Sequence, residues 1–470
     1  MGYRLRVIGS FIFCLLSFVF YLTGCSQYRV SDDPSLRLSF SCDTLCFDTV
    51  FTAEGSSTAQ LMVYNRNKSA IEIARAGLVA GTAFRINIDG EADPDYMTNI
   101  VINGEDSAFV FIRVDIDPLQ QNNPILITDE LRFHLTNGAM QSVYLEAYGQ
   151  DATRIGKKNG GRTVKSDFTF TADKPYILYD TVIIDGTLTL DAGARLYMHN
   201  NACLFALGDV YAHGTLEQPV LIRGDRLDRL FDSVPYAFAG GSWNGIYLQS
   251  EQPRNYDFSY TDILSGNIGL YCITTQPGGQ SMLTMDGCRI HNHAMYGLVL
   301  LNTDALVTNT EISNCASYCV YCDGGTHDFI HTTVASYFGC TNIRIQNVVK
   351  ENVAAVYINN LEKTGQQTVT SFYNSIITGH RDIQLIVATP IDRFYPGTFI
   401  GNFIGADTAK VFVNDFYRYK EYVYYDFHLD SLSPAIGLAD SLIALPYPTD
   451  RDGFSRAGVR PDAGCYQHQP

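Results

Sequence analysis

The pattern of apolar and polar positions repeats every 22 residues in the middle of the chain. Each copy places a β-branched residue in a short polar frame: Gly287-Cys-Arg-Ile-His-Asn292, Asn309-Thr-Glu-Ile-Ser-Asn314 and His331-Thr-Thr-Val-Ala-Ser336. Short β-branched runs separated by Asn, Gly and Ser are typical of a solenoid of stacked strands. Because no long apolar run has helical spacing, we predict a right-handed parallel β-helix and not a helical solenoid.

The same frame recurs on both sides of these three copies. Tyr260–Ser265 comes 27 residues before the first copy, and Asn374–Gly379 comes 43 residues after the third, which predicts two further coils. We expect Asn292 and Asn314 to stack their amides at a bend. Strand-like runs resume at Tyr176, so the β-helix with its C-terminal closing segment is predicted over residues 168–470.

A different pattern, in which apolar residues recur at every second position, precedes the solenoid. Between Ser107 and Asp117, every second residue is apolar, and several shorter segments separated by turn pairs such as Asn103-Gly104 follow the same rule. About seven short strands over residues 36–152 predict an immunoglobulin-like sandwich. The glycine-rich, basic stretch after it predicts a linker over residues 153–167.

Residues 1–24 have the features of an export signal. They contain Arg4 and Arg6, then an apolar run too short for an ordinary transmembrane helix, and no acidic residue. The ending Leu22-Thr-Gly-Cys25 resembles the lipobox of bacterial lipoproteins, and an ordinary secretory signal is the alternative. The resemblance implies cleavage before Cys25, acylation of Cys25, a tether over residues 25–35 and attachment to a membrane through the lipid anchor. A serine directly after the cysteine, Ser26, resembles the pattern of lipoproteins that are sent to the outer membrane. The resemblance implies a chain anchored there that faces the periplasm or the cell surface.

The charge balance narrows the class of partner. The full chain carries 33 Lys and Arg against 49 Asp and Glu, and losing Arg4 and Arg6 with the signal would take the net charge from −16 to −18. Binding to nucleic acid depends on neutralising phosphates, so we expect no nucleic-acid partner. No phosphate-binding loop or other cofactor motif is present, so no cofactor is expected.

Several segments together resemble a known group of proteins. The segments are Gly214–Asp228, Gly241–Ile246, Phe47-Asp-Thr-Val-Phe51, Tyr148-Gly-Gln-Asp151, Ser433–Ile436 and Asp452–Gly464. They resemble exported β-helix lipoproteins of Bacteroidota, and the likeness extends over essentially the whole mature chain. It implies an all-β chain with an N-terminal sandwich, a β-helix and an envelope location. It implies no established reaction.

Cysteine and histidine gather in the repeats, at Cys288, His291, His293, Cys315, Cys319, Cys322, His327, His331 and Cys340. Stacked parallel rows do not easily converge on one tetrahedral point, so we predict packing in the core and turns and no metal site. Most cysteines are expected to be buried thiols, with Cys42 and Cys46 as a candidate pair. Asp450-Arg-Asp-Gly453 resembles the start of a calcium loop but lacks the later glutamate, and is predicted to be a turn.

Five residues on the flank of the solenoid are candidates for chemistry: Asp257, Asp262, Arg289, His291 and His293. A polysaccharide lyase or hydrolase would need a base or two convergent carboxylates. Repeat alignment sets Arg289 beside Glu311, which predicts a salt bridge and no carboxylate pair. We therefore expect a non-catalytic surface component that binds a polysaccharide or a surface protein, with a lyase or hydrolase as the alternative and a purely architectural spacer as a third reading.

Aromatic residues are abundant, with 30 Tyr and 27 Phe but one Trp. A run of tyrosines between Tyr417 and Tyr425 would place rings on both faces of a strand. Outward rings on the flank of a β-helix can contact sugar rings, while a lateral loop packed onto the solenoid is the structural alternative.

Overall fold

The structure is a computed structural model, and the chain divides into two compact units, Met1–Gln150 and Asp151–Pro470. It describes residues 29–88, 91–93, 96–157, 160–231, 234–275, 280–338, 354–361, 367–379, 383–389, 397–406, 411–412, 418–419, 422–423, 426–457 and 460–469. Cys25 and the predicted signal lie outside these residues. Among the described residues, no helix has the length and apolar character needed to cross a membrane.

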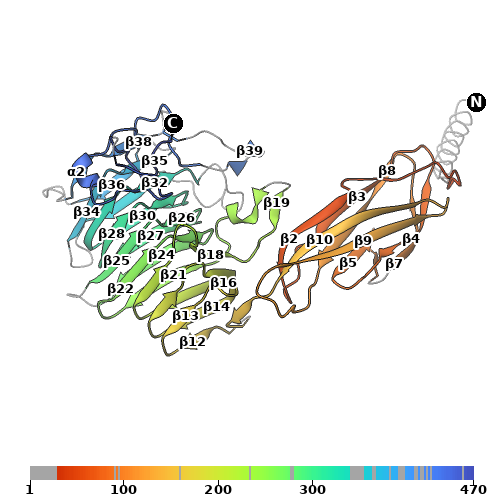
Figure 1. Cartoon of the computed structure of the whole chain (residues 1–470), viewed down its shortest axis with the longest axis horizontal. Coiled ribbons are helices and arrows are strands. Elements are labelled where there is room, and N and C mark those ends of the chain that lie inside the picture. The colour runs from red at the N-terminus through yellow and green to blue at the C-terminus, as the bar shows by residue number, and fades with distance from the viewer. Residues whose placement is uncertain are drawn as a thin grey trace, which may run out of the picture. The chain divides into compact units, whose positions relative to one another are not determined.

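The first unit is a sandwich of two five-stranded sheets (Figure 1). One sheet has the order β1 (Ser39–Phe40), β3 (Ala59–Asn65), β8 (Asp106–Val114), β5 (Phe84–Ile88) and β6 (Glu91–Asp93). The other has the order β2 (Thr44–Phe51), β10 (Met140–Gln150), β9 (Ile125–Leu135), β4 (Ile71–Leu78) and β7 (Tyr96–Ile102). Alternate residues point inward, as predicted for Val110, Ile112 and Val114, which are all fully buried.

The second unit is a parallel β-helix whose coils have three sides. Each complete coil adds one strand to a nine-stranded sheet and two strands to a 17-stranded sheet that bends over the other two sides. In the middle coils, β25 (Ser281–Asp286), β26 (Arg289–His291) and β27 (Tyr296–Leu301) pair in parallel with β28 (Thr303–Thr308), β29 (Glu311–Ser313) and β30 (Val320–Asp323). Figure 1 shows these strands in successive layers. The all-β fold class, a sandwich followed by a parallel β-helix, is confirmed.

The three sides are named here by their strands. The nine-stranded side contains β13 (Phe168–Phe170), β15 (Leu188–Leu190), β17 (Val210–His213), β22 (Asn255–Ser259), β25, β28, β31 (Gly325–Ile330), β34 (Thr368–Tyr373) and β37 (Phe399–Ile400). The Asp262 face contains β11 (Thr153–Ile155), the first parts of β14 (Tyr176–Ile184) and β16 (Arg195–Ala206), β18 (Val220–Gly224), β23 (Thr261–Leu264), β26, β29, β32 (Thr333–Ser336), β35 (Ile376–Gly379) and β38 (Phe403–Ala406).

The third side, the Tyr247 face, contains β12 (Arg162–Val164), the second parts of β14 and β16, β21 (Gly245–Ser250), β24 (Ile268–Thr274), β27, β30, β33 (Val356–Asn359) and β36 (Leu385–Ala388). Short elements outside the three sides are β19 (Arg229–Phe231), β20 (Val234–Pro235), the 3-10 turn η1 (Tyr236–Phe238), β39 (Arg418–Tyr419), β40 (Tyr422–Val423) and α2 (Ser441–Ala444).

The repeated β-branched residues form a continuous inward row. Ile290, Ile312 and Val334 pair from coil to coil and are fully buried, so each coil covers the inward residues of the next. Burial of this kind stabilises the stack, at roughly 25 cal/mol for each Å² of apolar surface removed from water. The frame identified in the sequence is therefore the wall of the solenoid core.

Asparagines turn the chain between sides. Asn292 and Asn314 have φ values of +65° and +56°, a conformation that Asn adopts more readily than most residues. As predicted, their amides stack: Asn314 Nδ2 donates to Asn292 Oδ1 at 3.1 Å.

Two sequence expectations about the solenoid are wrong. Val334 pairs directly with Ile377, so the 43-residue interval is one coil and not two. The predicted linker over 153–167 contains β11 and β12, which both pair with β14 and so belong to the solenoid wall. Glycine-rich composition misled here because Gly161 lies so close to the Thr181 carbonyl that a Cβ would collide with it.

Candidate functional site

The predicted flank residue Asp257 lies apart from the other four. It stands on β22, on the nine-stranded side, where its Oδ2 is 3.2 Å from Nε2 of His213. Both side chains are about half exposed, so this ion pair is a surface contact of small energetic weight.

Three of the five predicted residues, Asp262, Arg289 and His291, lie on the Asp262 face. Asp262 pairs with Arg289 in the strand register, and Arg289 pairs with Glu311 one coil further, as the repeat alignment predicted. The predicted salt bridge between Arg289 and Glu311 is wrong, however. The guanidinium instead contacts Asp262, with Nη2 at 2.8 Å from Oδ2, because a second partner occupies Glu311.

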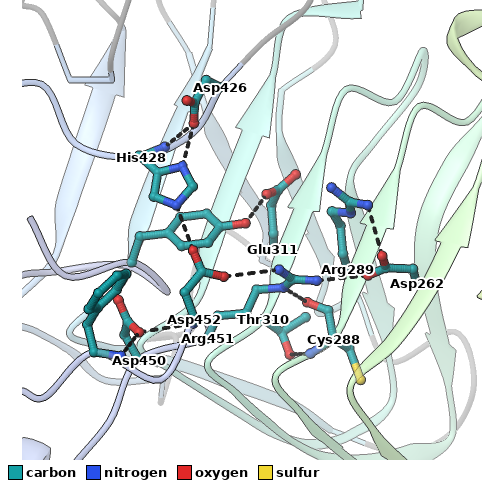
Figure 2. Close-up of polar contacts among 12 residues, drawn as sticks. Asp262, Cys288, Arg289, Thr310, Glu311, Asp426, His428, Asp450, Arg451 and Asp452 are labelled. Atoms are coloured by element: carbon teal, nitrogen blue, oxygen red, sulfur yellow. Dashed lines mark hydrogen bonds and ion pairs between the residues drawn. The ribbon is translucent and has the colours of Figure 1, made fainter. Parts of the chain in front are cut away.

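That partner belongs to the C-terminal strap, defined here as residues 426–457 and 460–469. Tyr466 donates its hydroxyl to Oε2 of Glu311 at 2.6 Å, and Arg451 Nη2 lies 2.8 Å from Oδ1 of Asp262 (Figure 2). Arg451 Nε also donates to the Cys288 carbonyl at 3.4 Å. The strap therefore covers the row of charged residues on at least three neighbouring strands.

Both carboxylate oxygens of Glu311 accept hydrogen bonds. Ser313 donates to Oε1 at 2.6 Å, and Nδ1 of His291 lies 2.8 Å from the Ser313 hydroxyl and 3.6 Å from Oε1. Burial alone would raise the pKa of this carboxyl. The neighbouring His291 and Arg289 outweigh burial and hold its pKa well below the usual range. Glu311 is thus an ionised, paired group and not a proton acceptor at neutral pH.

His428 adds a second ion-pair layer outside the first. Its Nδ1 lies 2.5 Å from Asp426 and its Nε2 lies 2.7 Å from Asp452, which also approaches Arg451 (Figure 2). Hydrogen bonds to Asp426 and Asp452 raise the pKa of His428 to about 10. The imidazole is therefore protonated at neutral pH and fixed between two carboxylates.

The predicted turn at Asp450 holds the strap in shape. One carboxylate oxygen of Asp450 accepts from the backbone N–H groups of Asp452 and Phe454, and the other accepts from the N–H of Gln467. Arg456 crosses from the strap to the solenoid, where it donates to Asn309 Oδ1 at 2.8 Å. These contacts give the segment that resembled a calcium loop a structural role.

The Asp262 face therefore offers poor conditions for catalysis. A general base must be free to take a proton, but Asp262 is paired with Arg289 and Arg451, and Glu311 accepts hydrogen bonds from Tyr466 and Ser313. Burial opposes the charge on Arg289, yet the carboxylates of Asp262 and Glu311 outweigh it and raise its pKa further. An arginine held in its charged form cannot act as a base.

His293, the fifth predicted residue, is an interior residue. Its Nδ1 accepts from the Gly266 N–H at 3.1 Å, and its Nε2 lies 3.1 Å from the Ile263 carbonyl. Complete burial lowers the pKa of His293 to about 3, so the ring is neutral and ties together two turns of the wall. Burial likewise lowers the pKa of His327 to about 4.

The cysteines behave as small apolar core residues. Cys203, Cys272, Cys288, Cys315, Cys319, Cys322 and Cys465 are buried free thiols. The candidate pair Cys42 and Cys46 is not joined, and Cys46 is exposed with its Sγ 3.8 Å from Glu146. Cys340 lies outside the described residues. Within the described part of the chain, no three His, Cys, Asp or Glu side chains are grouped so that they could hold a metal ion.

An aromatic surface on the Tyr247 face was not identified from the sequence. In register from coil to coil, the row consists of Phe205, Tyr247, Tyr271, Val299, Tyr321 and Tyr357, of which Val299 is buried. Tyr296 and Tyr318 lie beside this row. All seven aromatic side chains are partly exposed. The aromatic surface consists of these seven residues.

The rings contact one another in two groups. Phe205 stacks on Tyr247 at a centroid distance of 4.7 Å, and Tyr247 lies 5.6 Å from Tyr271. In the second group, Tyr321 stacks on Tyr357 at 5.5 Å, and Tyr318 lies 5.0 Å from Tyr357. Irregular intervals between these residues hid the row from a search for a fixed period. The tyrosine run singled out from the sequence, Tyr417–Tyr425, lies largely outside the described residues.

Comparisons with known proteins assign no family. No protein-family model matches the chain, and no curated protein matches it. One matching solved structure is the secreted serine protease VesC from Vibrio cholerae, with 16% identity over 26% of this chain and 25% of that chain and a TM-score of 0.19. Another is a PapD-like domain of human CEP192, with 10% identity over 26% of this chain and 91% of that chain and a TM-score of 0.18. A family 123 glycoside hydrolase from Clostridium perfringens also matches, with 8% identity over 26% of this chain and 30% of that chain and a TM-score of 0.19. The chain spans a quarter of the length of VesC, and likenesses this slight indicate no function.

Proposed function

We propose that this chain is an exported, lipid-anchored protein of the bacterial envelope whose solenoid binds a glycan without cleaving it. The export signal over residues 1–24 and the Leu22–Cys25 lipobox support the anchor, and Ser26 supports an outer-membrane location facing the periplasm or the cell surface. The likeness to exported β-helix lipoproteins of Bacteroidota supports the same location.

The aromatic surface is the observation that carries glycan binding. Tyrosine combines an apolar ring with a hydroxyl group, which suits ligands that present both C–H faces and hydroxyls. Six tyrosines and one phenylalanine on one face exceed what the solenoid needs for its core, because the inward positions of the same strands are already filled by Ile246, Leu270 and Leu298.

The pairing on the Asp262 face favours binding over catalysis. A lyase or hydrolase, the alternative suggested by the sequence, would need a free base or two free carboxylates. The acidic residues brought together there are already engaged: Asp262 is paired with Arg289 and Arg451, and Glu311 accepts a hydrogen bond from Tyr466.

Binding can be tested with the soluble chain from Ser26 onward in native gels that contain one polysaccharide each. We expect retardation by some glycans, and we expect Tyr321→Ala to abolish it while Tyr144→Ala, an exposed tyrosine of the sandwich, leaves it unchanged. Unsaturated-product absorbance and new reducing ends are followed in parallel. Turnover of any polysaccharide would overturn the non-catalytic proposal, and absence of retardation across the panel would overturn glycan binding.

The anchor can be tested separately by labelling cells with a radioactive fatty acid. We expect the label in the full chain and not in Cys25→Ser. Equal labelling of both would contradict acylation at Cys25.

A further inference from the structure

The aromatic surface also restricts the chemistry of its ligand. We infer that it takes a neutral glycan chain that lies along the solenoid axis, across successive coils, and this inference rests on the glycan binding proposed above. Charge, hydrogen-bonding capacity and spacing each support it.

Charge is the first restriction. The strands of the face from β21 to β36 contain no Lys, Arg, His or Glu within their described residues, and their one acidic residue is Asp323. Asp323 is buried and accepts from Asn359 Nδ2 at 2.8 Å. A uronic acid or sulfated glycan would meet no cation on these strands, and the acidic chain as a whole would repel it.

The hydroxyl groups supply the second restriction. Partial burial raises the pKa values of Tyr247 and Tyr271, and burial together with Asp323 raises the pKa of Tyr321 to about 12. These phenols remain protonated at any physiological pH and can both donate and accept hydrogen bonds. The hydroxyls of a neutral sugar are matched partners for such groups.

The spacing between neighbouring coils indicates the direction of the bound glycan. Residues in register on neighbouring coils are about 4.8 Å apart, as in any parallel sheet. An extended chain of β-linked pyranoses advances by a similar distance per sugar. A glycan along the axis can therefore place one sugar beside each rung from Tyr247 to Tyr357 and contact both ring groups, whereas a glycan across the axis would contact one group.

The experiment titrates the soluble chain with neutral oligosaccharides of increasing length, drawn from the glycans retarded in the gels, and with acidic oligosaccharides of equal length. We expect the affinity for neutral chains to rise with length until both ring groups are spanned, and acidic chains to bind at least about tenfold more weakly. We expect Tyr247→Ala and Tyr357→Ala each to weaken the affinity for the long neutral oligosaccharide about tenfold. Tyr247→Phe measures how much the hydroxyl of Tyr247 contributes to that affinity.

The outcomes separate this inference from the function on which it rests. Absence of binding to every glycan overturns the proposed function itself. Binding that prefers acidic chains and weakens steeply with salt overturns neutrality. Binding whose affinity does not depend on length, or that responds to Tyr247→Ala but not to Tyr357→Ala, overturns the axial direction. The buried Trp243, the single tryptophan of the chain, reports by its fluorescence whether each variant has a folded solenoid.

Discussion

Arg451 Nη2 lies 2.8 Å from Oδ1 of Asp262, although 189 residues separate the two along the chain. In a solenoid each coil normally contacts only its neighbours, so stability is close to a sum over adjacent pairs. The strap changes this, because it also reaches Thr333, whose Oγ1 accepts from the Cys465 N–H at 3.0 Å, and Asn374 two strands further on the chain. Coils that do not touch are thereby coupled.

We expect Arg451→Met to destabilise the solenoid by about 3 kcal/mol, because it removes one partner of a largely buried ion pair with Asp262. Unfolding in urea, followed by Trp243 fluorescence, should shift to lower urea and become less steep as the coils lose their coupling. Arg226→Met, which removes an exposed pair with Asp228, is the control and should cost less than about 1 kcal/mol. An unchanged midpoint in Arg451→Met would contradict a coupling role for the strap.

His428 should make stability fall at alkaline pH. Its pKa is raised to about 10 from an ordinary 6.5, so its contribution is fully present below about pH 6.5 and is lost as pH rises toward 10. The difference in melting temperature between the wild-type chain and His428→Gln should be largest near pH 6 and should shrink toward pH 10. A difference that stays constant over this range would mean that His428 is not charged in the folded chain.

The contribution of Glu311 to stability should have the opposite pH dependence to that of His428. Its pKa is lowered in the folded chain, so its contribution is present above the ordinary pKa of 4.5 and is lost as the pH falls through the lowered folded-state value. We expect Glu311→Gln to cost about 3 kcal/mol at pH 7, measured by urea unfolding, and less in acid. The matched change at the exposed Glu251 should have almost no effect. Equal effects of the two substitutions would argue against a buried network.

Cys46 should be the first described thiol to react with a water-soluble reagent. It is exposed, whereas seven other cysteines are buried. Partial burial and the nearby Glu146 raise its pKa, so Glu146→Gln should speed its labelling at pH 7.5. Peptide mapping by mass spectrometry identifies the labelled residue. Labelling of Cys272 or Cys315 in the native state would show that the core opens more readily than its packing indicates.

The pattern of apolar and polar residues predicted much of the fold. Both of its periods, two residues in the sandwich and 22 residues in the solenoid, follow from the local geometry of strands and coils. Alternation indicated the sandwich strands, and the 22-residue frame placed Ile290, Ile312 and Val334 in the wall. The count of coils after Val334 was wrong, since one longer coil and two ordinary coils lengthen the interval in the same way. Likewise, the register correctly set Arg289 beside Glu311 but did not show which carboxylate it contacts.

The sequence by itself thus determined the stacking of the coils, since side-chain direction in a strand alternates and neighbouring coils repeat the same frame. The proposed lipobox at Leu22–Cys25 also rests on the sequence alone, because it is a linear signal. Only the tertiary structure decided the partners of the charged residues and the extent of the aromatic surface. Arg451 and Tyr466 reach the Asp262 face from nearly the end of the chain, and the coils that carry Tyr247, Tyr271, Tyr321 and Tyr357 differ in length. Contacts between residues so far apart depend on how the whole chain folds, and no local pattern records them.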